Sequence, residues 1–146
     1  KFKDHLLTKK WINIKFKMDL SKTNITDISM LGNTLNLSYC QNIIDVLMLG
    51  NVYTLDLSDC ENITDVSMLG NVHTLNLSGI NITDVSMLGN VYTLDLSDCQ
   101  NITDVSMLGN VNTLNLSYCH NITDISMLGN VHIFDKSRYI NVRTYF

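Results

Sequence analysis

Proline is absent from this 146-residue sequence. No apolar run is long enough for a membrane-spanning helix, which needs about 20 residues. The lack of proline suits strands that stack in register, because proline cannot donate a hydrogen bond to a strand ladder. The chain opens with Lys1 rather than Met and shows no secretory signal at its start, as a fragment of a longer protein would. Its length fits one domain.

Basic residues are missing from the centre of the chain. Seven of the ten Lys and Arg residues lie between Lys1 and Lys22, and the other three are Lys136, Arg138 and Arg143. Residues 23–135 contain twelve acidic residues and no Lys or Arg. Since nucleic-acid binding needs cations to neutralise phosphates, a partner with a basic face fits this region better. The alternative is that acidic repeats only keep the protein soluble and that the basic ends cap the stack.

A short motif recurs through the acidic centre. NITDVSMLGN or a close variant begins at six positions: Asn24, Asn42, Asn62, Asn81, Asn101 and Asn121. Successive copies start about 20 residues apart, a period typical of repeat proteins. Self-similarity at this period predicts a solenoid in which each copy forms one coil and buries its apolar face against its neighbours.

The block between two motifs predicts a strand. In residues 54–58, TLDLS, apolar and polar residues alternate, which places Leu55 and Leu57 in the core. The apolar residues that follow recur every third position, which favours turns or short 3₁₀ segments over α-helices. Gly70 is expected to supply a positive φ where the chain returns to the next strand.

The spacing V-x-x-L-x-L-x-x-C-x-x-I resembles the leucine-rich-repeat consensus. We therefore predict an α/β-type leucine-rich-repeat solenoid with about seven short parallel strands on the concave face, turn or 3₁₀ return segments and little α-helix. Three segments are expected: a basic N-terminal cap or remnant of a preceding domain at 1–17, the solenoid at 18–136, and a C-terminal half-coil or tail at 137–146.

The two ends of the array are expected to differ from its middle. Residues 18–20, Met-Asp-Leu, stand where Leu-Asp-Leu stands in later strands. Aligning the last copy in the same way places His132 at the strand entrance, Asp135 between the two core positions and Lys136 at the second of them. A lysine there is tolerable only if no further coil buries it.

Cysteine recurs at one position of the coil: Cys40, Cys60, Cys99 and Cys119. Ile80 fills the same position in another coil, which predicts a buried and largely apolar slot. Successive coils could hold two cysteines within reach of a disulfide, but we favour reduced thiols and hence an intracellular setting. The sequence has no C-x-x-C pair, and we expect no metal.

Aspartate forms a second ladder: Asp27, Asp45, Asp65, Asp84, Asp104 and Asp124. A calcium array would need several oxygen ligands per ion, whereas each coil offers one carboxylate here. We predict instead that each aspartate accepts a hydrogen bond from an amide of the turn that follows it.

Asparagine and methionine also recur once per motif. The asparagines that open the motifs are expected to hydrogen-bond along the solenoid, although five of the six also form N-I-T glycosylation sequons. A methionine stripe can serve as a binding surface, but we expect these side chains to pack on the return side. The stripe comprises Met30, Met48, Met68, Met87, Met107 and Met127.

Nothing in the sequence indicates catalysis. The four histidines stand in different contexts, and no phosphate loop, dinucleotide fingerprint or H-E-x-x-H motif occurs. A residue that repeats in every coil is better explained by structure than by chemistry. We predict that the chain is not an enzyme and needs no cofactor.

Positions that vary within the constant scaffold are the candidates for binding. The residue between the two strand leucines alternates between Asn and Asp, and Tyr, His or Asn stands at the strand entrance. After the strands come Tyr39, Asp59, Gly79, Asp98 and Tyr118. Tyrosines among carboxylates suit a basic peptide or protein patch, unless the alternation only reflects duplication of a two-coil unit. The predicted partner-binding residues of the concave face are Tyr53, Asp56, His73, Asn76, Tyr92, Asp95, Asn112 and Asn115.

The repeats resemble three groups of known proteins. ITDVSMLGNVHTLNLSxC resembles the leucine-rich-repeat proteins of giant DNA viruses of amoebae, and the frequent Asn, Ile and Lys fit an AT-rich genome. ITDVSxL is similar to internalin repeats, which have a longer period and Asn in place of Cys. C-x-x-I-T-D resembles the repeats of F-box substrate receptors, and residues 6–14 resemble part of an F-box helix. The last resemblance implies substrate recognition for a ubiquitin ligase.

These observations predict a non-catalytic, monomeric protein-interaction module that binds a protein with a basic face through its acidic, tyrosine-containing concave surface. The resemblances add a role as a substrate receptor and, for a viral protein, a host partner in the host cytoplasm. Neither nucleic acid nor membrane is expected as a partner. The alternative is a secreted or surface adhesion-type repeat protein that is glycosylated.

Overall fold

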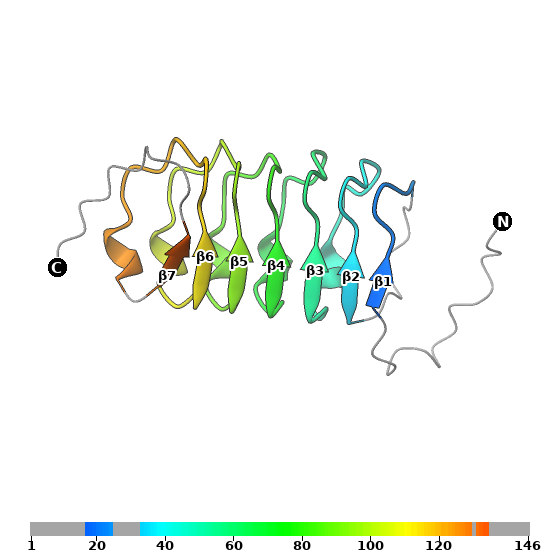
Figure 1. Ribbon diagram of the computed structural model, residues 1–146, viewed down its shortest axis with the longest axis horizontal. Coiled ribbons are helices and arrows are strands. Elements are labelled where there is room, and N and C mark those ends of the chain that lie inside the picture. The colour runs from blue at the N-terminus through cyan, green and yellow to red at the C-terminus, as the bar shows by residue number, and fades with distance from the viewer. Residues whose placement is uncertain (1–16, 25–32, 130, 135–146) are drawn as a thin grey trace.

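The computed structural model describes residues 17–24, 33–129 and 131–134. Within these ranges it contains seven short strands: β1 (Lys17–Asp19), β2 (Thr34–Asn36), β3 (Thr54–Asp56), β4 (Thr74–Asn76), β5 (Thr93–Asp95), β6 (Thr113–Asn115) and β7 (His132–Phe134). They form one parallel sheet in sequence order (Figure 1). Five 3₁₀ helices follow strands β2–β6: η2 (Leu47–Leu49), η3 (Ser67–Leu69), η4 (Ser86–Leu88), η5 (Ser106–Leu108) and η6 (Ser126–Leu128). The described residues contain no α-helix, and the predicted fold class is confirmed.

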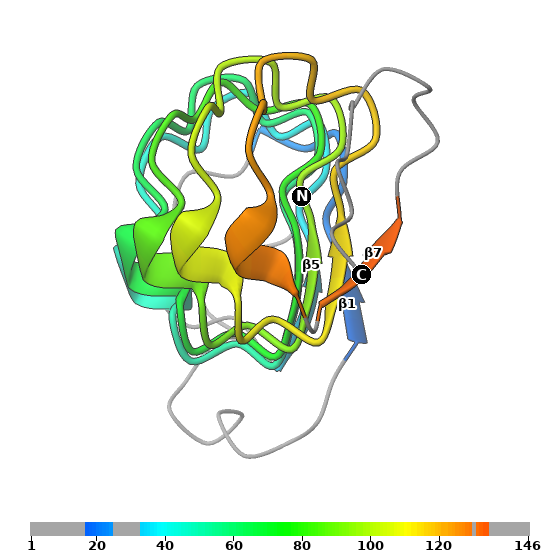
Figure 2. The same cartoon turned by 90° about the vertical axis from the view of Figure 1, so that its left-hand side faces the viewer.

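The solenoid has two long faces. A view along its axis shows the strands on one side and the 3₁₀ helices on the opposite side (Figure 2). We call the outward surface of β1–β7 the strand face and the outward surface of η2–η6 the return face. Each face repeats once per coil, so neighbouring coils place equivalent residues side by side.

Each coil contributes one row of side chains to a continuous core. In the coil of β3 these residues are at most 1% exposed: Leu55, Leu57, Cys60, Ile63, Val66, Leu69 and Val72. These buried residues are two positions apart along the strand and three apart around the return. The first spacing matches the two-residue repeat of a strand, and the second matches the three residues per turn of a 3₁₀ helix. The strands pair without any shift, so Leu55 lies between Leu35 and Leu75. Burying one such leucine stabilises the fold by about 1.5–3 kcal/mol.

The chain takes a positive φ after the strand and not at the glycine of the motif. Gly70 has φ −62°, in the right-handed region, so the expectation of a positive φ there is wrong. The left-handed residues stand at the strand exit: Lys22, Tyr39, Asp59, Gly79, Asp98 and Tyr118. At this corner the amide of Cys60 donates to the carbonyl of Leu57, which closes a tight turn before the return begins.

The motif glycines are required for close packing between coils. A Cβ atom on Gly70 would overlap the backbone carbonyl oxygen of Met87 in the next coil, and one on Gly89 would overlap that of Met107. Backbone cannot move aside as the end of a side chain can, so any larger residue would push the coils apart. Gly129 meets nothing within 4 Å among the described residues, since it lies in the last motif.

The cysteines occupy the buried slot that the sequence predicts. All four are buried free thiols in this structure. Each Sγ donates to a backbone carbonyl in the preceding coil, as from Cys60 to Leu37 at 3.1 Å and from Cys99 to Leu77 at 3.1 Å. Burial raises the pKa of Cys60 to about 11 and that of Cys99 to about 12. The protonated thiol therefore has a structural task, which is to satisfy a carbonyl at the strand exit.

The aspartate ladder caps the 3₁₀ helices as predicted. In five successive coils the carboxylate accepts the amide two residues later, as from Ser67 to Asp65 at 2.9 Å and from Ser106 to Asp104 at 2.8 Å. This bond is stronger to the ionised carboxylate, and it therefore lowers the pKa of Asp65 and of Asp104. Asp27, the remaining member, lies outside the described residues.

The last strand departs from the register that the repeats predict. In the structure Ile133 pairs with Leu114 and Phe134 pairs with Asn115. Aligning the copies would instead have paired Asp135 with Asn115, which is wrong by one residue. The T-L-x-L pattern that fixes β2–β6 is missing here. Either register would set an apolar residue, Ile133 or Phe134, opposite Leu114, so the apolar pattern does not select one of them.

Candidate interaction surface

The structure places all eight predicted binding residues on the strand face or its entrance edge. Four stand at the last position of β3–β6: Asp56, Asn76, Asp95 and Asn115. The other four directly precede these strands: Tyr53, His73, Tyr92 and Asn112. Because the strands pair in register, each set forms a row across four coils.

The row at the strand ends has a structural task. Its side-chain oxygens accept the backbone amide two residues later, as from Ser58 to Asp56 at 3.0 Å and from Ser78 to Asn76 at 3.0 Å. Both Asn and Asp carry the Oδ1 atom that this Asx turn uses, which explains why the position takes only these two residues. The turn leads the strand into the left-handed corner.

Alternation of Asn and Asp in this row separates the charges. Asp56 lies between Asn36 and Asn76 in the pairing, so no two carboxylates are direct neighbours on β2–β6. Asn115 also donates from Nδ2 to Oδ2 of Asp95 at 2.9 Å. Like charges on adjacent strands would repel, so the alternation has an electrostatic reason, whether or not it arose by duplication of a two-coil unit.

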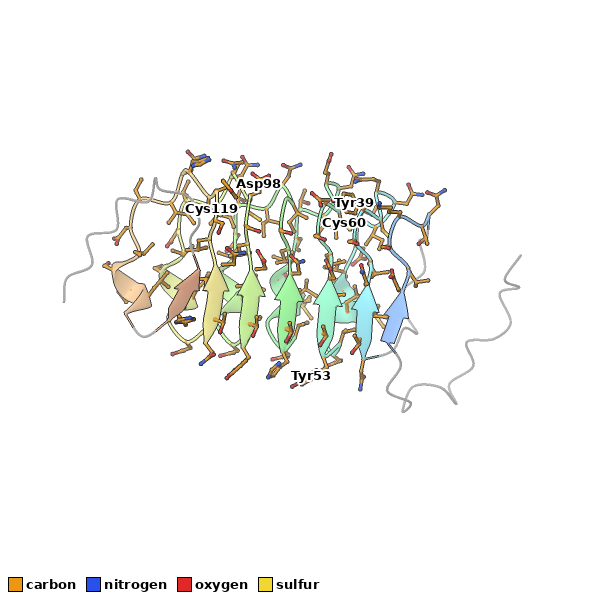
Figure 3. All side chains as sticks on the ribbon, viewed as in Figure 1. Tyr39, Tyr53, Cys60, Asp98 and Cys119 are labelled. Carbon is orange, nitrogen blue, oxygen red and sulfur yellow. The ribbon has the colours of Figure 1, made fainter. Side chains whose placement is uncertain are left out.

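The row at the strand entrance contains three stacked aromatic rings. The ring centroids of Tyr53 and His73 lie 4.4 Å apart with 14° between the planes, and those of His73 and Tyr92 lie 4.8 Å apart with 20°. Both tyrosines are about half exposed, at 55% and 50%. Figure 3 shows Tyr53 at the edge where the strands begin. We call Tyr53, His73 and Tyr92 the aromatic row; none of them belongs to the core.

A second set of exposed residues lies at the opposite end of the strands. Tyr39 and Asp98 are labelled there in Figure 3. The hydroxyl of Tyr39 bonds the Asp59 carboxylate, and this bond and the charge of Asp59 raise the pKa of Tyr39. The ammonium of Lys22 lies 5.2 Å from the centroid of the Tyr39 ring, a cation–π contact at the end of the acidic region.

The methionine stripe lies on the return side as expected, but its side chains are exposed. Met48, Met68, Met87, Met107 and Met127 are 52–65% exposed on the return face, so the expectation that they pack is wrong. The segment V-S-M-L places Val and Leu inward, three residues apart, and leaves Ser and Met outward on a tight 3₁₀ turn. The three-residue spacing of the apolar positions could have predicted this exposure. Met30 lies outside the described residues.

Metal and membrane sites are not seen in the described part of the chain. No group of three or more His, Cys, Asp or Glu side chains there is close enough to hold a metal ion. Every helix in the same ranges is too short to cross a bilayer.

Comparisons with known proteins agree with this geometry. A leucine-rich-repeat profile matches residues 90–108, which cover one coil, and a search of curated proteins found no match. The structure is similar to internalin C2 of Listeria monocytogenes, at 26% identity and a TM-score of 0.67 over 87% of this chain and 63% of that one. It is also similar to internalin inlF of the same organism, at 24% identity and a TM-score of 0.56 over 73% and 36% of the two chains.

This chain therefore spans less than two thirds of either internalin. The comparisons give no support to the resemblance with giant-virus proteins. The repeated motif, the parallel sheet and the similar solved structures together show that the protein has a leucine-rich-repeat fold of the internalin type.

Proposed function

We propose that this chain is a non-catalytic protein-interaction module that binds a partner with a basic face through its strand face. The aromatic row carries this proposal. Three stacked rings stand on one edge of the sheet, and two of them leave half of their surface in water. Stacking holds each ring in place before binding, so little side-chain entropy is lost when a partner covers the row.

Charge supports a basic partner. Asp56 and Asp95 end the strands that the aromatic row precedes, and Asp59 and Asp98 follow at the strand exit. No lysine or arginine lies in residues 23–135 to offset them. A basic face would be steered toward this surface, and its arginines could pair with carboxylates beside the rings. The role of a substrate receptor rests on the F-box resemblance alone and stays a prediction.

The test replaces both exposed tyrosines by the residue that the fold already holds at the equivalent position, Asn112. Tyr53→Asn/Tyr92→Asn should keep the melting temperature and lose the partners that the parent captures from a lysate at low salt. Captured proteins should carry basic patches and dissociate at high salt. The matched control, Thr103→Ala/Thr123→Ala on the return face, should capture as the parent does. If the tyrosine variant captures the same proteins as the parent, the aromatic row is not the contact surface.

An intracellular setting is part of the same proposal. The thiols of the four cysteines act as hydrogen-bond donors to backbone carbonyls, a task that a disulfide would remove. The sequon asparagines Asn62 and Asn121 donate from Nδ2 to carbonyls of the preceding coil, at 2.7 and 2.6 Å. A glycan on Nδ2 would compete with these bonds, which speaks against the secreted alternative. Thiol titration and mass spectrometry of protein from its native source would test this: four free thiols and no glycan are expected.

A further inference from the structure

Shallow hollows repeat along the return face between successive 3₁₀ helices. One of about 340 Å³ is lined by Thr64, Asp65 and Ser67 of one coil and by Asp84 and Met87 of the next. Smaller hollows follow in the two coils after it, with the same residue types around them. In each of these hollows the earlier of the two coils contributes a Thr and a Ser to the lining, and both side chains are exposed to solvent.

The coil of η2 departs from this pattern. Its motif reads NIIDVLMLGN, so Ile44 replaces the Thr and Leu47 replaces the Ser. Ile44 is 71% exposed and Leu47 is 55% exposed. Together with Asp45, Val46, Asp65 and Met68 they line a hollow of about 200 Å³, which we call the η2 hollow.

Folding does not account for these two residues. The equivalent positions in four other coils hold Thr and Ser. Those coils have the same 3₁₀ helix, the same buried Leu, and a Val or Ile that packs on the core. The amide of Leu47 still donates to Asp45 at 2.8 Å, as the Ser amides do, so the cap does not need a Leu. Two large apolar side chains in water, beside exposed Met48 and Met68, mark an interaction site better than a structural one.

The η2 hollow also has a charge. Asp45 and Asp65 stand on either side of it, and each carboxylate accepts an amide from its own turn. That bond lowers the pKa of Asp65, so this carboxylate is ionised near neutral pH. The nearest lysine or arginine in the sequence is Lys22, one coil before the hollow.

We propose that the η2 hollow binds a short polypeptide segment that presents an apolar side chain next to Lys or Arg. The apolar side chain would cover Ile44 and Leu47, and the cation would pair with Asp45 or Asp65. A stable interface between two globular copies needs about 20–30 residues on each side, far more than the six that line this hollow, so a narrow segment fits better than a second copy. The site lies on the return face and is independent of the function proposed for the strand face.

Methionine methyl NMR on the full chain tests the proposal directly. The probes are a synthetic heptapeptide of alternating Lys and Leu, one with Glu in place of Lys, and one with Ser in place of Leu. With ¹³C-methyl methionine, the Lys–Leu peptide should shift the Met48 and Met68 signals, and both control peptides should shift them far less. Equal shifts at Met87 and Met107, or no shift at any methionine, would overturn the proposal.

Two variants locate the site by exchanging the residues between coils. Ile44→Thr/Leu47→Ser restores the common motif and should weaken binding of the Lys–Leu peptide on the order of tenfold or more, with an unchanged melting temperature. Thr103→Ile/Ser106→Leu should create a second site that shifts Met107 and Met127. Unchanged affinity in the first variant would overturn the proposal. So would Met48 shifts that grow with protein concentration alone, since these would make a second copy the occupant.

Discussion

The strand face and the return face hold neighbouring coils together in different ways. On the strand side, backbone groups of successive coils are joined by hydrogen bonds, as from Leu57 to Asn76 at 2.9 Å. On the return side, backbone bonds such as that from Leu69 to Val66 stay within one coil, and neighbouring coils meet where Gly70 packs against Met87. The backbone bonds of the strand side leave the residues at the strand entrance free to vary, although each strand end keeps the Asn or Asp of its Asx turn. On the return side the contact between coils requires a glycine, and only the side chains that point to solvent can vary.

The largest effect is expected in the core that both faces share. Leu77 is fully buried in the central coil, so Leu77→Asp would bury an unpaired charge and should cost at least about 4–5 kcal/mol, enough to unfold the array. Leu77→Met, which keeps the volume, should cost less than about 1.5 kcal/mol. Urea unfolding followed by circular dichroism measures both, and an aspartate variant as stable as the parent would refute the register of β4.

A smaller but more specific loss is expected from glycine on the return face. Gly89→Ala should destabilise the protein by about 1–3 kcal/mol, because the new methyl group overlaps the Met107 carbonyl. Gly129 has the same right-handed backbone but no neighbour within 4 Å among the described residues. Gly129→Ala should therefore be neutral or stabilise by up to about 1 kcal/mol, since alanine loses less backbone entropy on folding. Equal effects in the two variants would show that coil contact does not explain the glycines.

Alkaline pH should weaken the strand-exit corner through its thiols. The pKa of Cys60 and Cys99 is raised to about 11 and 12, so both stay protonated in the folded chain after they ionise in the unfolded one. Their contribution is complete below pH 9 and is lost as pH rises through 11, at about 1.4 kcal/mol per pH unit and thiol. Cys60→Ala/Cys99→Ala should flatten this part of the unfolding free energy against pH. If the unfolding free energy of the variant still falls with pH above 9 as steeply as that of the parent, other titrating groups cause the slope.

The smallest effect concerns the charge alternation on the strand face. Asn76→Asp would set three carboxylates side by side with Asp56 and Asp95, and should cost about 0.5–1 kcal/mol at low salt. The Asx turn survives, because Asp keeps the accepting oxygen. The loss should shrink in 1 M NaCl, where such charges are screened. Asp56→Asn, which removes a charge instead, should show no such salt dependence.

Most of the fold could be predicted because the same pattern of apolar and polar residues occurs in six copies of the motif. Alternation at Leu55 and Leu57 predicted the strands, the three-residue spacing predicted the 3₁₀ returns, and both are confirmed. Prediction failed where copies differ or where the reason lies in another coil. The last strand lacks the pattern and slips by one residue, and the role of Gly70 depends on the Met87 carbonyl in the next coil.

The candidate site was predicted only in part. The alternation of apolar and polar residues predicted that Asp56 and Asn76 point outward. It could not predict that their side chains accept a backbone amide in an Asx turn, because an outward position has the same pattern with or without such a bond. The stacking of Tyr53 on His73 depends on the exact pairing of β3 and β4. The motif spacing predicted which residues are neighbours but not the distance or angle between the two rings. Ile44 belongs to a close variant of the motif, and the sequence alone did not show that its side chain is exposed.

Site-specific photo-crosslinking tests the central claim, that the strand face is the binding surface, most directly. A photoreactive phenylalanine analogue would replace Tyr53, Tyr92 or, as the return-face control, Thr103. Adducts to the same basic protein from positions 53 and 92, absent from position 103 and reduced at high salt, are the predicted result. Adducts from position 103 alone would contradict the account and move the interface to the return face.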